Sequence, residues 1–65
     1  MLLAIDIGNT QTAVGLLDGR NVVAHWRLTT VADRTEDELR VYLTGLLSLE
    51  GYELGDISGV VLSSV

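Results

Sequence analysis

The residues best suited to chemistry lie in one short segment, Asp6-Ile7-Gly8-Asn9-Thr10. This segment directly follows the apolar run 1–5. An apolar run without polar alternation is typical of a strand that is buried on both faces. Asp6 should therefore emerge at the carboxyl edge of that strand, which is where ligands bind in open sheets.

The residues around Asp6 suit the binding of a phosphate group. Gly8 has no Cβ, so we expect a turn with positive φ that brings backbone N–H groups against an anion. Asn9, Thr10 and Thr12 add short side-chain donors near the same point. A carboxylate repels a phosphate at close range, so Asp6 is predicted to hold Mg²⁺, directly or through water. We interpret the segment as a nucleotide-binding turn.

The same residues also fit an ordinary hairpin. Gly8-Asn9 lies between two strand-like runs, and a glycine at the first central position is what a type II′ turn requires. The position of Asp6 favours the nucleotide interpretation, because a carboxylate directly after a buried strand is costly unless a cation meets it.

Composition and charge argue against several classes of partner. The chain has 65 residues, no Cys and a formal net charge of −5, and its four cations are scattered arginines. Without a basic cluster, neither nucleic acid nor an anionic membrane is an expected partner. No apolar stretch approaches the roughly 20 residues of a membrane span. We expect a cytoplasmic protein, and the absence of Cys fits a reducing compartment.

The length and the last residues predict an incomplete unit. A chain of this size forms at most one small domain and buries only about 60% of its extended surface. It ends in the strand-like run 60–65, which no turn follows. We therefore expect a fragment of a longer protein.

Three strands are predicted to form a meander at the start of the chain. Residues 11–17 read as a second strand, with Gly15 expected at a bulge or a close approach. Asp18-Gly19 predicts a hairpin with a type I′ turn. Residues 22–29 then alternate between a mainly apolar and a mainly polar face, which indicates a third strand.

A helix should begin after Thr35 and end at Gly51. Thr35 and Glu38 match a capping box, and the acidic residues of the first turn suit the helix dipole. Apolar residues then recur at helical spacing and predict one buried face. This face is formed by Leu39, Tyr42, Leu43, Leu46 and Leu47.

The apolar run 60–62 is predicted to be a strand parallel to the first one. Strand–helix–strand connections are almost always right-handed and leave their two strands parallel. The first strand is the natural neighbour, because it is apolar without alternation. Under this pairing Asp6 and Ser63-Ser64 reach the same edge of the sheet, which places two hydroxyls beside the turn.

The other candidate side chains are expected to have structural roles. His25 should be solvated or hydrogen-bonded on the polar face of its strand, and Trp26 should face the core. Arg27 is predicted to be solvated, although it could reach an acidic partner or a subunit interface. Asp33 and Arg34 precede the helix cap and are expected to order the loop before the helix.

This order of elements resembles the first half of an actin-like ATPase domain. That α/β fold is ribonuclease H-like and also occurs in sugar and acetate kinases, heat-shock chaperones and actin. Four segments closely resemble type III pantothenate kinase and together span essentially the whole chain. They are Asp6-Ile7-Gly8-Asn9-Thr10-Gln11-Thr12, His25-Trp26-Arg27-Leu28-Thr29-Thr30, Arg34-Thr35-Glu36-Asp37-Glu38-Leu39 and Leu62-Ser63-Ser64-Val65. Residues 1–65 would be the N-terminal part of the first such domain.

The resemblance implies ATP-dependent phosphorylation of pantothenate to 4′-phosphopantothenate, the first step towards coenzyme A. It implies that ATP binds at the turn, with Asp6 positioning Mg²⁺. It also implies a monovalent cation, K⁺ or NH₄⁺, and a homodimer. The general-base Asp and most pantothenate contacts would lie beyond residue 65, so this segment alone should be inactive. The implied ATP contacts are Asp6, Ile7, Gly8, Asn9, Thr10, Gln11, Thr12 and Ala13.

Two other functions fit the same residues. One is a non-catalytic relative that binds ATP as an accessory or regulatory protein. The other is an actin- or chaperone-like ATPase, in which hydrolysis drives a conformational change. A downstream Asp placed to deprotonate an alcohol in line with the γ-phosphate would distinguish a kinase from both.

Overall fold

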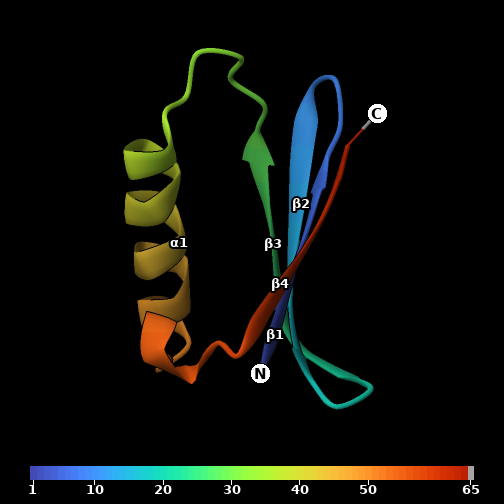
Figure 1. The fold of residues 1–65 in the computed structure, drawn as a ribbon, viewed down its shortest axis with the longest axis vertical. Coiled ribbons are helices and arrows are strands. Elements are labelled where there is room, and N and C mark those ends of the chain that lie inside the picture. The colour runs from blue at the N-terminus through green and yellow to red at the C-terminus, as the bar shows by residue number, and fades with distance from the viewer. Residues whose placement is uncertain (65) are drawn as a thin grey trace.

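A computed structural model describes residues 1–64 of the chain. Within them, a single sheet has helix α1 lying along one face (Figure 1). Val65, the last residue of the predicted run 60–65, lies outside the described residues. The elements in chain order are β1 (Leu2–Ile7), β2 (Gln11–Asp18), β3 (Asn21–Thr29), α1 (Glu36–Leu49), the 3₁₀ helix η1 (Leu54–Asp56) and β4 (Gly59–Ser64).

The sheet has the strand order β3-β2-β1-β4. Strand β2 is antiparallel to both β1 and β3, whereas β4 is parallel to β1. This confirms the predicted meander of three strands, followed by a helix and a parallel strand. It is the α/β arrangement expected for the start of an actin-like ATPase domain.

The core lies between α1 and one face of the sheet, and we call the opposite face the open face. Alternate residues of a strand point to the same face, so β1 and β2 each contribute every second side chain to the core. Trp26 packs against this core, as predicted. The buried apolar side chains are Leu3, Ile5, Val14, Leu16, Leu43 and Leu47.

The side chains of strand β4 are not covered by helix α1. Val60, Val61 and Leu62 are 59%, 53% and 63% exposed. Successive strand residues point to opposite faces, so neither face of β4 is covered by residues 1–64.

Helix α1 begins and ends where the sequence predicts. Its N-cap is Thr35, whose Oγ1 accepts from the Glu38 backbone N–H at 3.2 Å. At the other end Gly51 has φ +82°, and its N–H donates to the Ser48 carbonyl at 3.0 Å. The Tyr52 N–H donates to the Leu47 carbonyl at 2.9 Å. These two bonds form a Schellman motif, which needs a residue such as glycine in the left-handed conformation.

Two details of the helix differ from the prediction. The Glu38 carboxylate accepts from the Thr35 hydroxyl at 3.4 Å, whereas a capping box would use the Thr35 backbone N–H. Tyr42 is 48% exposed, so it lies at the margin of the apolar face. The Arg34 guanidinium lies over its ring, 4.5 Å from the centroid, so a cation–π contact joins the preceding loop to the helix.

The β2–β3 hairpin forms as predicted, but its turn is not of the predicted type. Asp18 pairs with Asn21, so the central residues are Gly19-Arg20. Only Gly19 of this pair has positive φ, at +62°. A type I′ turn needs positive φ at both central positions, so the prediction was wrong, and the glycine instead meets the requirement of type II′.

The predicted irregularity at Gly15 was also wrong. Gly15 pairs regularly with His25, and a Cβ built on it would only make ordinary contact with Leu17, at 3.9 Å. The register instead shifts between Leu16 and Leu17, which leaves Val23 of β3 as an extra residue. Such a bulge increases the local twist of the strand.

Candidate functional site

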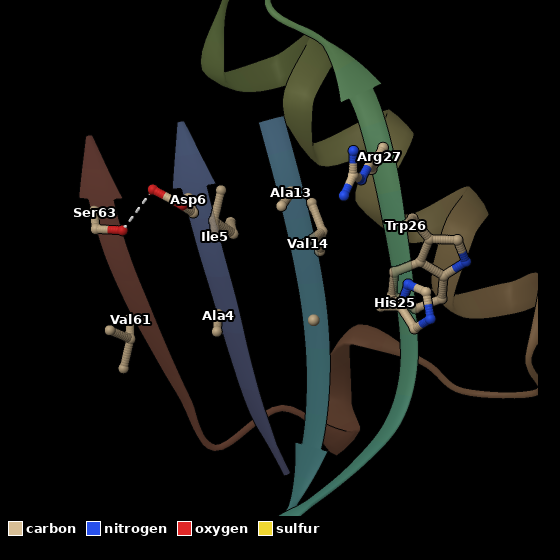
Figure 2. Close-up of a pocket in the computed structure, with 11 residues that line it drawn as sticks. Ala4, Ile5, Asp6, Ala13, Val14, His25, Trp26, Arg27, Val61 and Ser63 are labelled. Carbon is tan, nitrogen blue, oxygen red and sulfur yellow. Dashed lines mark hydrogen bonds between the residues drawn. The ribbon is translucent and has the colours of Figure 1, made fainter. Parts of the chain in front are cut away.

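Four side chains form a row across the open face near the carboxyl ends of β1 and β4. Arg27 pairs with Ala13, Ala13 with Asp6, and Asp6 with Ser63. The Ser63 hydroxyl donates to Asp6 Oδ1 at 2.9 Å (Figure 2). This contact confirms that Asp6 and Ser63 reach the same edge of the sheet, and it fixes the orientation of the carboxylate.

A hollow of about 310 Å³ lies over this row on the open face. Small residues, Ala4, Ala13 and Gly15, leave its centre empty. Figure 2 shows Asp6 with its hydrogen-bonded partner at one side and Arg27 on β3 at the other. With one strand between them and a strand spacing of about 4.8 Å, the Cα atoms of Asp6 and Arg27 are about 10 Å apart. That span leaves room for a small group between the carboxylate and the guanidinium.

Arg27 is exposed, as predicted, but it also has a partner within the chain. Its Nη1 donates to Gln11 Oε1 at 3.2 Å. Gln11 is the first residue of β2 and one of the implied ATP contacts. The guanidinium is therefore held near the turn that joins β1 to β2. His25 lies two residues earlier on the same face and is exposed.

The turn between β1 and β2 does not have the conformation predicted for Gly8. Among the described residues only Gly19 and Gly51 have positive φ, which rules out both the predicted left-handed Gly8 and the alternative type II′ turn. Glycine is required here for space instead. The Gly8 N–H donates to the Gln11 carbonyl at 2.9 Å, and a Cβ on Gly8 would lie 2.7 Å from that oxygen.

The implied ATP contacts do not all converge on one point. Asp6 and Ala13 lie on the open face, whereas their neighbours Ile7 and Thr12 lie on the face covered by α1. Thr12 is 6% exposed, and its Oγ1 lies 2.9 Å from the Thr30 Oγ1. The exposed polar groups that remain near Asp6 are those of the turn itself, at Asn9, Thr10 and Gln11.

Sequence reasoning missed Thr30. It lies in the connection after β3, and its hydroxyl donates to the Gly8 carbonyl at 2.9 Å. Its bonding partners Thr12 and Gly8 are 18 and 22 positions away. No local spacing signals such a contact. The pairing of β2 with β3, which places Thr29 opposite Gln11, was the nearest available clue.

Asp6 is the only acidic residue of the row, which bears on how a metal would bind. In residues 1–64 there is no cluster of three or more His, Cys, Asp or Glu side chains suited to a metal ion. Mg²⁺ is commonly bound through one or two carboxylates together with water and substrate phosphates. One oriented carboxylate beside a turn fits such an ion. None of the helices in the described part of the chain is long and apolar enough to span a membrane.

Comparison with known proteins gives a consistent result over the whole chain. A family model described as type III pantothenate kinase matches residues 2–65. Proteins of that name from Streptomyces avermitilis and Streptomyces griseus are each 53% identical, over 98% and 95% of the chain. One from Sphingopyxis alaskensis is 46% identical over 100% of the chain. The chain covers 26%, 25% and 25% of these three relatives, about a quarter of their length.

Proposed function

The chain belongs to the type III pantothenate kinase family, and from this premise we propose that the protein containing it phosphorylates pantothenate with ATP. The γ-phosphoryl group would pass to the primary hydroxyl of pantothenate, giving 4′-phosphopantothenate and ADP, the first step of coenzyme A biosynthesis. The single observation that supports a role for this segment is the Asp6–Ser63 hydrogen bond of 2.9 Å, next to a tight turn at the carboxyl edge of the sheet.

In this proposal the turn holds the phosphates of ATP. Backbone N–H groups and the side chains of Asn9 and Thr10 would donate to phosphate oxygens, which is how oriented amides stabilise an anion. Residues 6–13 remain the proposed contact segment. Arg27, held by Gln11 at 3.2 Å, would add a positive charge to the same edge.

The Asp6 carboxylate is the proposed contact for Mg²⁺, directly or through water. Its Oδ1 accepts from the Ser63 hydroxyl, which leaves Oδ2 and the second lone pair of Oδ1 for the ion or its water. A bound Mg²⁺ would neutralise charge on the phosphates during transfer. Asp6 would thus position the ion and would not itself move a proton.

The rest of the reaction requires groups outside residues 1–64. We place the general-base Asp and most pantothenate contacts there. We also propose a K⁺ or NH₄⁺ requirement, a homodimer and a cytoplasmic location, as the family resemblance implies. A net charge of −5 with scattered arginines supports a small-molecule partner over nucleic acid or a membrane surface.

ADP release by the complete enzyme tests the proposal. Wild type, Asp6→Asn and Asp18→Asn would be assayed with Mg·ATP and K⁺, with and without pantothenate. Asp18 is a matched control, because it is an exposed Asp at the opposite end of the sheet. We expect pantothenate-dependent release that falls by about 100-fold or more in Asp6→Asn and is unchanged in Asp18→Asn.

The other outcomes identify the alternatives. Hydrolysis that does not depend on pantothenate would favour an actin- or chaperone-like ATPase. ATP binding without turnover would favour an accessory protein. An Asp6→Asn enzyme with normal turnover would contradict the role of this segment.

A further inference from the structure

Thr30 reaches both ends of the turn Gly8–Thr10 from outside the β1–β2 hairpin. Its hydroxyl donates to the Gly8 carbonyl and its backbone N–H donates to the Thr10 carbonyl, both at 2.9 Å. Its Oγ1 also lies 2.9 Å from the Thr12 Oγ1. We propose that Thr30 is a positioning residue that holds this turn in the shape that receives the phosphates of ATP. The inference rests on the proposed function.

The direction of the hydroxyl bonds follows from counting hydrogens. A threonine hydroxyl has one hydrogen to donate, and that of Thr30 goes to the Gly8 carbonyl. The Thr12 hydroxyl must therefore donate to Thr30. Thr12 is 6% exposed, so this bond satisfies a buried polar group. The result is a chain of two bonds that ends on the turn, and each bond polarises the next one.

Fixing the carbonyls of the turn also fixes its amides. In a trans peptide the C=O and the N–H of the same unit point in opposite directions, and the described residues contain no cis peptide. The Gly8 carbonyl shares its unit with the Asn9 N–H, and the Thr10 carbonyl shares its unit with the Gln11 N–H. Because Thr30 binds both carbonyls, it makes both amides point away from itself. An anion-binding turn needs N–H groups that are already oriented.

Removal of the hydroxyl alone would test this role in the complete enzyme. Thr30→Val keeps the shape of the side chain and the backbone N–H, but it leaves the Gly8 carbonyl and the Thr12 hydroxyl without their partner. We expect the KM for ATP to rise about tenfold, which is in the range that the loss of these hydroxyl bonds predicts, while the KM for pantothenate changes by less than about twofold. Thr30→Ser should restore the wild-type value, because it restores the hydroxyl.

Thr29→Val is the matched control. Thr29 is the exposed neighbour at the end of β3, so the same substitution there should leave both KM values unchanged. If Thr30→Val left the KM for ATP unchanged, or if Thr30→Ser failed to rescue it, the positioning role would be overturned. Equal rises in both KM values would also overturn it, because they would indicate general damage to the fold.

Hydrogen exchange in the nucleotide-free enzyme supplies a readout that needs no turnover. Thr30→Val should speed amide exchange in residues 6–12 and leave residues 16–22, at the other hairpin, unchanged. Unchanged exchange in residues 6–12 would overturn the proposal. A wild-type enzyme without pantothenate-dependent ADP release would instead overturn the proposed function, so the two failures are distinguishable.

Discussion

The two hairpin turns of the sheet both contain a glycine, yet they need it for different reasons. At Gly19 the backbone has φ +62°, and within residues 1–64 an added Cβ would have no atom within 4 Å apart from its chain neighbours. At Gly8 the backbone is not left-handed, and an added Cβ would lie 2.7 Å from the Gln11 carbonyl oxygen. One glycine is required for its conformation and the other for space.

The turns also differ in how they are held. Thr30 binds the first turn from outside its hairpin, through the carbonyls of Gly8 and Thr10. In the described part of the chain no side chain from another element bonds to Gly19 or Arg20. A turn that only reverses the chain needs no such support. A turn fixed by contacts from elsewhere in the fold is preorganised, as a binding site must be.

Among substitutions that test this difference between the turns, Gly8→Ala should have the largest effect. The new Cβ would push apart Gly8 and the Gln11 carbonyl, so the turn would lose the conformation that Thr30 maintains. We expect kcat/KM for ATP to fall by about 100-fold in the complete enzyme, comparable to the loss of a preorganised donor. Steady-state kinetics with varied ATP would measure it. A decrease of less than about threefold would show that the close contact is not needed.

Gly19→Ala should affect stability and leave activity intact. An L-residue in the left-handed region costs about 1–2 kcal/mol, so the free energy of unfolding should fall by that amount in denaturant titrations. The kcat/KM for ATP of the folded enzyme should not change. A loss of activity as large as that of Gly8→Ala would remove the distinction between the turns.

Ser63→Ala tests the support of Asp6 beside the first turn. Without the 2.9 Å bond the Asp6 carboxylate is free to rotate, and we expect kcat/KM for ATP to fall about fivefold, as for a single hydrogen bond. Ser48→Ala, on the exposed surface of α1, is the control. If both variants behaved alike, the Asp6–Ser63 contact would have no part in the reaction.

Gly45→Ala should have the smallest effect. It serves as the control for the substitutions at Gly8 and Gly19. Gly45 lies inside α1 with φ in the ordinary range, and among the described residues an added Cβ would have no atom within 4 Å apart from its chain neighbours and the backbone of the helix itself. Alanine should therefore raise the free energy of unfolding by about 0.5–1 kcal/mol. A decrease, measured by the same titration, would mean that another part of the complete protein packs against this position.

The sequence predicted the features that depend on local patterns or on topology rules. Thr35 and Gly51 set the ends of α1, and the handedness of strand–helix–strand connections placed Ser63 beside Asp6. It could not predict the type of the Gly19 turn, because the extra residue Val23 and the closing pair Asp18–Asn21 become visible only in the register.

The close contact at Gly8 and the hydrogen bonds of Thr30 could not be predicted from the sequence either. The close contact at Gly8 depends on where the Gln11 carbonyl lies in space. The bonds of Thr30 join residues 18 and 22 positions apart, so no periodicity marks them. Both features arise when the meander closes, and local propensity contains no information about either.

The contact between Asp6 and Ser63 has a consequence for the order of folding. It joins residues 57 positions apart, whereas the two hairpins join near neighbours in the chain. Local contacts form faster because closing a short loop costs less entropy. The meander can thus assemble early during synthesis, while Asp6 gains its partner only after β4 has paired. The Asp6 carboxylate, our proposed contact for Mg²⁺, is therefore oriented late, and only once the parallel strand is in place.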